Sequence, residues 1–297
     1  MTKSNLPRAV NWHLWTRCNY KCSYCFATFE DLPKKSYLDK QDSFKMLNDL
    51  VEFGASKITF VGGEPMLHPF LDELLDEAKK LKLTTCIVSN GSRITKKFLD
   101  GNRQNIDWIG LSIDASNDEL HSKLGRGLNK DISRSKSNHL ENAIKVWDLC
   151  KEYNIRMKLN TVVCKINASD NMSALVLSLK PERWKIFEAM SVEGQNSLKE
   201  DNLLLDPGEF DLWLERHRHV KEHGIQFVPE SNDLMRGSYA MIDALGRFYS
   251  SASGSHVYSK PIPVVGVEEA WQKVNFSDEL FLKRGGIYNW SSELVQI

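Results

Sequence analysis

Apolar runs that favour β-strands alternate with segments of helical periodicity through the first two thirds of the chain. The strand-like runs cover residues 9–16, 56–61, 83–89, 107–113, 155–163 and 183–190. This alternation is typical of βα units that build a parallel sheet. Six such units predict an α/β fold of the partial (β/α)6 TIM-like barrel type, open rather than closed by eight strands.

Two of the intervening segments show a buried helical stripe. In residues 39–53 the stripe consists of Phe44, Leu47, Leu50 and Val51. In residues 139–153 it consists of Leu140, Ala143, Val146, Trp147 and Cys150. Both sets follow the i, i+3, i+7 spacing of one helix face, so we expect each helix to pack against the sheet.

The rhythm changes after about residue 190. Pro207 and Glu209 open a predicted helix that runs to Gly224, and a strand-like IQFVP follows. Residues 250–266 are rich in Gly, Ser and Pro, which favours loops. We therefore expect a barrel over residues 1–190 and a C-terminal α+β extension over residues 191–297 that caps the barrel mouth.

Composition excludes several classes of protein. The 297 residues are 41% hydrophobic, enough for a folded core, and 39 basic residues balance 39 acidic ones. No overall field attracts nucleic acid, so an anionic ligand needs a local cluster of cations. The chain has neither a run near the ~20 apolar residues of a membrane span nor a signal peptide, which predicts a cytoplasmic protein with reduced cysteines.

Three cysteines follow the first strand directly. Cys18, Cys22 and Cys25 have the spacing C-x3-C-x2-C, which can bind three corners of a 4Fe-4S cluster and leave the fourth iron open. The amino and carboxylate groups of S-adenosylmethionine can chelate that iron, and reductive cleavage then gives a 5′-deoxyadenosyl radical. The alternative is a structural zinc site, which needs a fourth ligand such as His13.

The other three cysteines belong to apolar patterns. Cys86, Cys150 and Cys164 lie within strand-like or helical runs, so we expect them in the core.

A glycine pair with a carboxylate ends the second strand. Gly62 and Gly63 allow a ligand to approach the backbone, and Glu64 can accept a hydrogen bond from an ammonium group. One βα unit after the cysteine triplet, this motif matches the site for the methionine amine in radical S-adenosylmethionine enzymes.

Alternate residues on the predicted strands place polar side chains on one face. The pairs that share a face are Asn11 with His13, Ser112 with Asp114, Lys158 with Asn160, and Arg183 with Lys185. Three cations on adjacent strands are costly inside a barrel unless an anion neutralises them. Lys283-Arg284-Gly285-Gly286 adds cations beside flexible backbone, which suits phosphate. The alternatives are solvated strand ends and an ordinary surface loop.

Several segments together carry a family resemblance. TRCNYKCSYCF and GGEP are general to radical S-adenosylmethionine enzymes, whereas the more specific segments are VSNGS, GRG, KLN, RWKIF, EGQNS, VPESN and LKRGGIYNWS. Over residues 10–292 the chain resembles viperin and its microbial relatives, which are antiviral nucleotide-modifying enzymes.

This resemblance implies a reaction. The radical takes the 4′-hydrogen of a ribonucleoside triphosphate (CTP, UTP or GTP), the 3′-hydroxyl leaves as water, and one electron is taken up. The product is a 3′-deoxy-3′,4′-didehydro nucleotide, which terminates chains made by viral polymerases.

The resemblance also implies roles for single residues. The expected contacts of S-adenosylmethionine are Gly62, Gly63, Glu64, Ser112, Arg126 and Asn160. The expected triphosphate ligands are Lys158, Arg183, Lys185 and Arg284. Asn11 and Tyr239 would flank the nucleotide, with Tyr239 and Lys158 as the catalytic residues. Tyr239 would protonate the departing hydroxyl. Its alternative role is a half-buried tyrosine that caps the core.

The family implies an electron donor such as flavodoxin or ferredoxin, delivery by cluster-assembly machinery, and a monomer that binds neither nucleic acid nor membrane. Three features depart from animal viperins. The amphipathic N-terminal helix is missing, residues 294–297 read LVQI instead of an acidic-aromatic tail that receives the cluster, and Val61 replaces a serine.

Rival readings are the GTP cyclase of molybdopterin synthesis, a peptide-modifying relative and a non-catalytic metal-binding interaction protein. The first two carry extra cysteines in a C-terminal domain, whereas this chain has none after Cys164.

Overall fold

One mixed sheet organises the molecule. The computed structural model describes residues 8–128, 137–197 and 203–290. In these ranges ten strands form a single sheet in the order β10-β9-β8-β1-β2-β3-β4-β5-β6-β7. The strands are β1 (Ala9–His13), β2 (Lys57–Val61), β3 (Thr84–Ser89), β4 (Trp108–Ser112), β5 (Arg156–Val163), β6 (Arg183–Glu188), β7 (Gln226–Glu230), β8 (Ala240–Ile242), β9 (Arg247–Ser250) and β10 (Val257–Pro261). All neighbours from β8 to β7 are parallel, while β9 and β10 are antiparallel to their neighbours.

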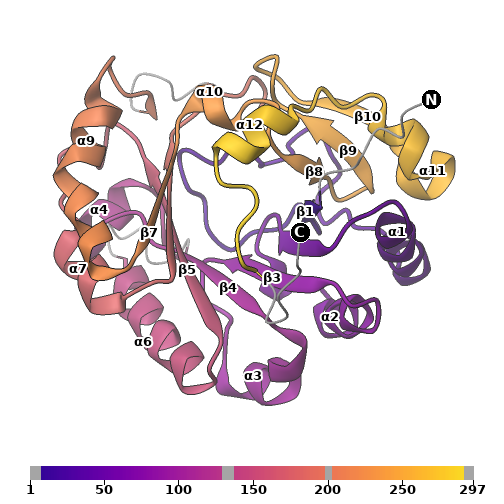
Figure 1. Ribbon diagram of the computed structural model, residues 1–297, viewed down its shortest axis with the longest axis horizontal. Coiled ribbons are helices and arrows are strands. Elements are labelled where there is room, and N and C mark those ends of the chain that lie inside the picture. Colours follow the sequence, from indigo (N-terminus) through magenta and orange to yellow (C-terminus); the bar gives the residue numbers. More distant parts are fainter. Residues whose placement is uncertain (1–7, 129–136, 198–202, 291–297) are drawn as a thin grey trace.

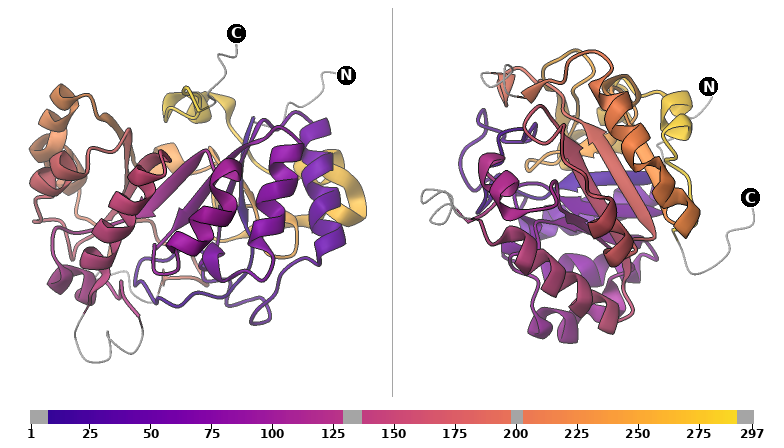
Figure 2. Two further views of the ribbon diagram at one scale, coloured as in Figure 1. Left: turned by 90° about the horizontal axis from the view of Figure 1, so that it is seen from below. Right: turned by 90° about the vertical axis from the view of Figure 1, so that its left-hand side faces the viewer.

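Most of the helices lie on the outside of this curved sheet (Figures 1 and 2). The helices are α1 (Lys40–Glu52), α2 (Leu71–Lys80), α3 (Lys96–Asn102), α4 (Asp118–Lys123), α6 (His139–Glu152), α7 (Ser173–Leu179), α9 (Glu209–His217), α10 (Asn232–Met235), α11 (Ile262–Trp271) and α12 (Asp278–Lys283). Pro65–Leu67, Arg103–Asn105 and Arg218–His223 form 3₁₀ turns. Among the described residues, no helix is both long enough and apolar enough to cross a bilayer.

The prediction of an open α/β barrel is confirmed. The six strands of the βα units appear within a few residues of their expected bounds, although β1 ends at His13 rather than at residue 16. The edge strands β7 and β10 do not pair with each other. Figure 1 shows α10 and α12 beside the opening that this leaves.

The chain after residue 190 extends the same sheet on both sides. Strand β7 pairs with β6, while β8 pairs with β1 in parallel. The domain boundary near residue 190 stays a prediction, and so does the division of the chain into a barrel and a separate C-terminal extension. Residues 294–297, where the tail departs from animal viperins, lie outside the described residues.

The expected loop over residues 250–266 is wrong. Strand β10 and the first half of α11 lie there, and β9 precedes them. Strands β8 and β9 span only three and four residues, which is too short for a clear alternation. Helix α11 contains Pro263 at its start and Gly266 with φ of 82°, so its sequence resembles a turn.

The apolar core lies between the sheet and the helices. Leu47 and Leu50 of α1 are fully buried there, while Phe44 and Val51 are partly buried. The second predicted stripe is confirmed as well, because Trp147 and Cys150 of α6 are fully buried. The outward-facing strand residues fill this core, so the polar residues between them face the inside of the barrel.

This core predicts how two leucine truncations differ. Leu47→Ala should lower the free energy of unfolding by about 2–5 kcal/mol, because Leu47 is fully buried between α1 and the sheet. Leu212→Ala on α9 should change it by no more than about 0.5 kcal/mol, because Leu212 is 68% exposed. Urea unfolding of both variants measures the difference. Equal losses would contradict this assignment of the core.

Candidate functional site

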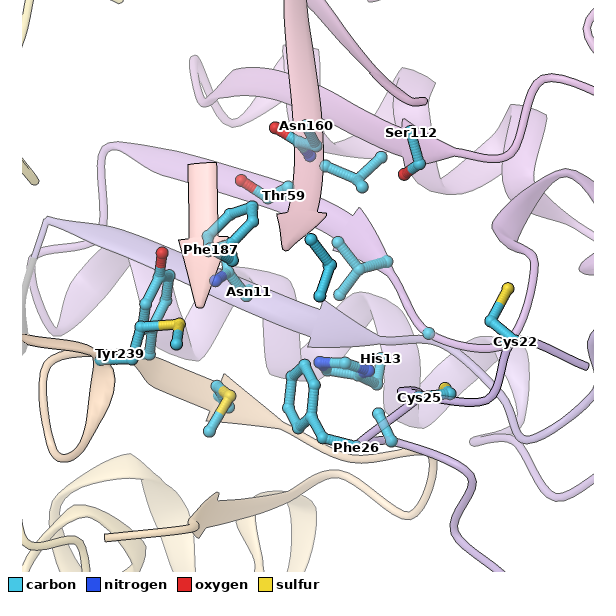
Figure 3. Close-up of a pocket in the computed structure, with 18 of the residues that line it drawn as sticks. Asn11, His13, Cys22, Cys25, Phe26, Thr59, Ser112, Asn160, Phe187 and Tyr239 are labelled. Carbon is cyan, nitrogen blue, oxygen red and sulfur yellow. The ribbon is translucent and has the colours of Figure 1, made fainter. Parts of the chain in front are cut away.

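A single large cavity occupies the inner face of the sheet. It has a volume of about 1090 Å³ and reaches from the loop of the three cysteines to residues 281–288. Figure 3 shows part of it, with Asn11, Thr59 and Asn160 from three strands between the cysteines and Tyr239. All residues that the sequence assigned to the site line this cavity. Their individual roles stay predictions.

The cysteine loop forms the wall at the carboxyl ends of the strands. Cys18, Cys22 and Cys25 all line the cavity, and none of them forms a disulfide. The loop is tightened by its own backbone, since Cys25 N donates to Cys22 O (3.3 Å) and Tyr20 N donates to Cys18 Sγ (3.3 Å). The three side chains therefore come from one short, closed turn.

The GRG segment holds this loop in place. Ser23 N donates to Leu124 O at 3.0 Å. Gly125 has φ of +70°, and a Cβ there would lie 2.3 Å from Lys21 O. A side chain at position 125 would push the loop away, so glycine is required for this contact.

Glu64 fastens the next loop rather than facing the cavity freely. Its carboxylate accepts from Asn90 N (2.8 Å), Ser89 Oγ (2.7 Å) and Met66 N (3.1 Å). A carboxylate offers about four acceptor positions, so one is left for a ligand. Burial raises the pKa of Glu64, although these hydrogen bonds oppose the rise.

The two glycines before Glu64 form a close cradle. A Cβ on Gly62 would lie 2.4 Å from His13 Cα, and one on Gly63 would lie 2.1 Å from Arg17 O. Both residues have positive φ, so backbone approach and conformation each demand glycine.

A buried ion pair supports the wall beside Cys22. Arg126 pairs with Asp114, which also accepts from the Tyr24 hydroxyl and from Val162 N at 2.8 Å. Burial raises the pKa of the Cys22 thiol, and the Arg126 cation opposes this rise. Arg126 therefore has a positioning contact in place before any ligand binds.

The donor set at this end fits an iron–sulfur cluster with an amino-acid chelate. Three thiols share one wall, and no fourth cysteine lines that part of the cavity. In the described residues no three His, Cys, Asp or Glu side chains converge on a single-ion site, whereas a cubane takes one thiolate at each of three separate corners. Asn160 lines the same cavity, and its Oδ1 is buried without a hydrogen-bond partner, which suits a polar ligand.

Cations crowd the opposite end of the cavity, toward the amino ends of the strands. The five that are buried or partly buried there are Lys57, Lys158, Arg183, Lys185 and Arg284. Burial lowers the pKa of Lys57 and Lys158 to about 8 and that of Lys185 to about 7. This region is therefore strongly electropositive and poorly hydrated, which favours a polyanion.

Glu230 is the buried carboxylate within this group of cations. It lies 2.8 Å from Lys185 and 3.9 Å from Arg284, and it accepts a hydrogen bond from Tyr239. Burial alone would raise its pKa, but Lys185 and Arg284 hold the pKa of Glu230 below its usual value. One carboxylate leaves most of the positive charge uncompensated.

Tyr239 contacts both the cations and the buried carboxylate of this region. Its hydroxyl accepts from Lys185 Nζ at 2.7 Å and donates to Glu230, while the Arg284 guanidinium lies 3.6 Å from the centre of its ring. Its side chain lines the cavity (Figure 3). The contacts do not decide between a proton donor and a structural cap, because both need a buried, bonded hydroxyl.

Sequence reasoning missed four residues of the site. Lys57 shares the inner face of β2 with Thr59, so alternation could have found it. Cys86 is buried as expected but lines the cavity rather than the outer core. Glu230 and Tyr288 belong to the segments VPESN and LKRGGIYNWS, which carried the family resemblance, but no periodicity assigned either residue a place in the site.

His13, the alternative fourth ligand, forms no single-ion site with the cysteines among the described residues. It packs edge-on against Phe26, Phe29 and Tyr249 at 5.4–6.2 Å between ring centres. Burial lowers its pKa to about 3, so the ring is neutral.

Comparisons with known proteins give the family of the chain. A model of the family described as "Radical SAM superfamily" matches residues 12–174. A protein of Flammeovirga pacifica named S-adenosylmethionine-dependent nucleotide dehydratase is 39% identical, covering 97% of each chain. A protein of Lacinutrix mariniflava with the same name is 40% identical over 99% of this chain, which spans 60% of that relative's length. A fish protein, RSAD2 of Oncorhynchus mykiss, is named likewise and is 37% identical over 97% of this chain and 82% of its own.

Solved structures show the same fold. SuiB of Streptococcus suis bound to S-adenosylmethionine has a TM-score of 0.67 at 19% identity, covering 95% of this chain and 68% of its own. The enzyme anSMEcpe with bound AdoMet and a peptide has a TM-score of 0.69 at 15% identity, and the match covers 92% of this chain and 83% of the anSMEcpe chain.

The buried lysines predict how thermal stability depends on pH. Folding lowers the pKa of these lysines from 10.5 to about 7 or 8. At low pH each lysine is therefore charged in a buried place, which destabilises the folded state. This loss of stability shrinks as the pH rises from the folded-state pKa toward 10.5. The melting temperature of the ligand-free protein should therefore rise from about pH 7 to about pH 9. Saturating inorganic tripolyphosphate should raise it by roughly 5 °C at pH 7 and by less at pH 9.

Two variants make this test specific. Lys57→Gln in the cavity should reduce the response to tripolyphosphate, whereas Lys145→Gln, paired with Glu141 on the surface of α6, should preserve it. Scanning fluorimetry at constant ionic strength provides the measurement. Equal responses at both pH values, or in both variants, would argue against a polyanion site here.

Proposed function

The chain belongs to the radical SAM superfamily and, within it, to the S-adenosylmethionine-dependent nucleotide dehydratases, and we propose that its substrate is a ribonucleoside triphosphate. The observation that carries this proposal is the two-ended cavity, with three cysteines at one end and five cations at the other. The five cations favour a polyanion over a peptide as the substrate, because peptides rarely match so much buried positive charge.

Each end of the cavity has a distinct task in this proposal. When bound, the cluster and S-adenosylmethionine supply a 5′-deoxyadenosyl radical that removes hydrogen from carbon. Cys18, Cys22 and Cys25 would hold three irons. The cofactor would be held by Gly62, Gly63, Glu64, Ser112, Arg126 and Asn160. Glu64 would use its one remaining acceptor position for the ammonium group.

The other end would bind and orient the nucleotide. Lys158, Arg183, Lys185 and Arg284 would hold the triphosphate, and Lys57 extends the same wall. Asn11 and Tyr239 would flank the ribose and direct its 4′-hydrogen toward the cysteine end. Fixing both reactants in one cavity would be the main contribution of these residues to the rate.

The dehydration step needs one proton and one electron. After loss of the 4′-hydrogen, the C3′–oxygen bond breaks, the hydroxyl takes a proton and leaves as water, and an external donor supplies an electron. The product is the 3′-deoxy-3′,4′-didehydro nucleotide. Tyr239 would give the proton, and Lys185, whose Nζ lies 2.7 Å away with a pKa of about 7, would restore it.

We further infer the setting of the enzyme from this chemistry. It would work in the cytoplasm, where thiols stay reduced, as a monomer with flavodoxin or ferredoxin as electron donor. Cluster-assembly machinery would load the cysteines. The product would serve antiviral defence by terminating viral chains.

Anaerobic incubation with S-adenosylmethionine, dithionite and each of CTP, UTP, GTP and ATP tests the proposal. We expect 5′-deoxyadenosine together with a nucleotide product lighter by one water in at least one reaction, detected by mass spectrometry. Cys18→Ala should abolish both products, whereas Cys150→Ala, in the apolar core, should retain them. 5′-Deoxyadenosine that is independent of all four nucleotides would contradict the substrate assignment.

A second test separates proton donation from capping by Tyr239. Tyr239→Phe should lower dehydrated product by about 100-fold or more while 5′-deoxyadenosine still forms, because hydrogen abstraction does not need the phenol. Tyr37→Phe, outside the cavity and 42% exposed, serves as the matched control. If both products of Tyr239→Phe fall in parallel with its melting temperature, Tyr239 is a structural cap.

A further inference from the structure

The closing segment, residues 285–290, crosses the end of the cavity that lies toward the amino ends of the strands. Figure 1 shows the chain leaving α12 and passing inside the sheet toward β3 and β4. Gly286 allows this path, since a Cβ there would lie 2.4 Å from the Phe281 ring. At the far end, Trp290 O accepts a hydrogen bond from Trp108 Nε1 at 2.9 Å, and Trp290 is buried. The segment is therefore fixed at both ends.

Tyr288 is the residue of this segment that meets the cations. Its hydroxyl lies 2.6 Å from Lys57 Nζ and also accepts from Lys158. The Arg183 guanidinium stacks on its ring, 4.0 Å from the ring centre, and Trp108 packs against the ring edge at 5.8 Å. One side chain thus contacts three of the five cations.

The donor and acceptor balance of this hydroxyl leaves its proton unused. A lysine ammonium group can only donate, so Lys57 and Lys158 occupy both lone pairs of the phenol oxygen. Among the described residues, the Tyr288 hydroxyl donates to none. Burial raises the pKa of Tyr288, so the proton stays in place at neutral pH. Tyr288 lines the cavity, where an anionic oxygen could accept this hydrogen bond.

The cations form two groups along the cavity. Lys185 and Arg284 contact Tyr239, whereas Lys57, Lys158 and Arg183 contact Tyr288. Arg183 and Lys185 are two residues apart on β6, which corresponds to about 7 Å along the strand. A phosphate chain that begins beside Tyr239 must span this length to reach Tyr288.

We propose that Tyr288 binds the terminal phosphate and makes the enzyme select a nucleoside triphosphate over the diphosphate. This inference rests on the proposed function. The hydroxyl donates to the last phosphate while Lys57 and Lys158 neutralise it from either side. A diphosphate is one unit shorter and lacks this contact. The closing segment behind Tyr288 limits the length of the phosphate chain.

Tyr288→Phe is the decisive variant, because it keeps the ring between Arg183 and Trp108 and removes only the hydroxyl. We would titrate the reconstituted holoenzyme with the accepted nucleoside triphosphate and its diphosphate, with S-adenosylmethionine but without reductant, by anaerobic calorimetry. The wild type should prefer the triphosphate. In Tyr288→Phe the Kd for the triphosphate should rise about tenfold and that for the diphosphate should stay unchanged. Tyr153→Phe, whose hydroxyl bonds Lys96 on the outer surface, should behave as wild type.

The outcomes separate this inference from the proposed function. Equal affinity of the wild type for the two nucleotides, or an equal loss of both in Tyr288→Phe, would overturn the role of Tyr288. The second result would mean that the hydroxyl only holds the lysines. No binding of any nucleoside triphosphate by the folded wild type would instead refute the substrate class.

Discussion

Burying like charges together is the constraint on which this site depends. Five cations line one end of the cavity, and Glu230 is the carboxylate that contacts two of them, Lys185 and Arg284. The protein stabilises this arrangement with aromatic faces and phenol oxygens in addition to a counterion. Arg284 stacks on Tyr239, and Arg183 stacks on Tyr288. These contacts hold the cations in position without neutralising them, so the remaining charge is available to a ligand.

The parallel sheet separates the two chemistries along the strand direction. Loops at the carboxyl ends carry the cysteines and the glycine cradle, where flexible backbone can surround a cofactor. Side chains on the inner face carry the charge toward the amino ends, where rigid strands fix their spacing. Glu64 illustrates the link between loops, because its hydrogen bonds to Ser89 and Asn90 join the ends of β2 and β3. The resulting separation keeps a metal cluster away from the anionic part of a substrate.

Local periodicity was enough to predict the strands of the βα units and the face shared by Lys158 and Asn160, because each strand obeys a two-residue repeat. The same rule applies to Lys57, which was overlooked on a strand that otherwise looks apolar. Strands β8 and β9 escaped prediction because three or four residues are too few for a repeat to show, and β10 lies in a segment whose Gly, Ser and Pro content favours loops. Glu230 and Tyr288 could not be found from pattern alone. Their partners lie on strands or segments distant in the sequence, so only the folded chain reveals them.

The position of β8 has a consequence for protein synthesis. Strand β1 is among the first segments to be made, yet one of its two neighbours in the sheet is β8, at Ala240–Ile242. Until that part emerges from the ribosome, the edge of β1 is unpaired and open to association with other nascent chains. The last of the five cations, Arg284, and Tyr288 arrive later still. The nascent chain can therefore present its cysteines to an assembly factor before it has a place for a nucleotide, so cluster loading can precede substrate binding in time.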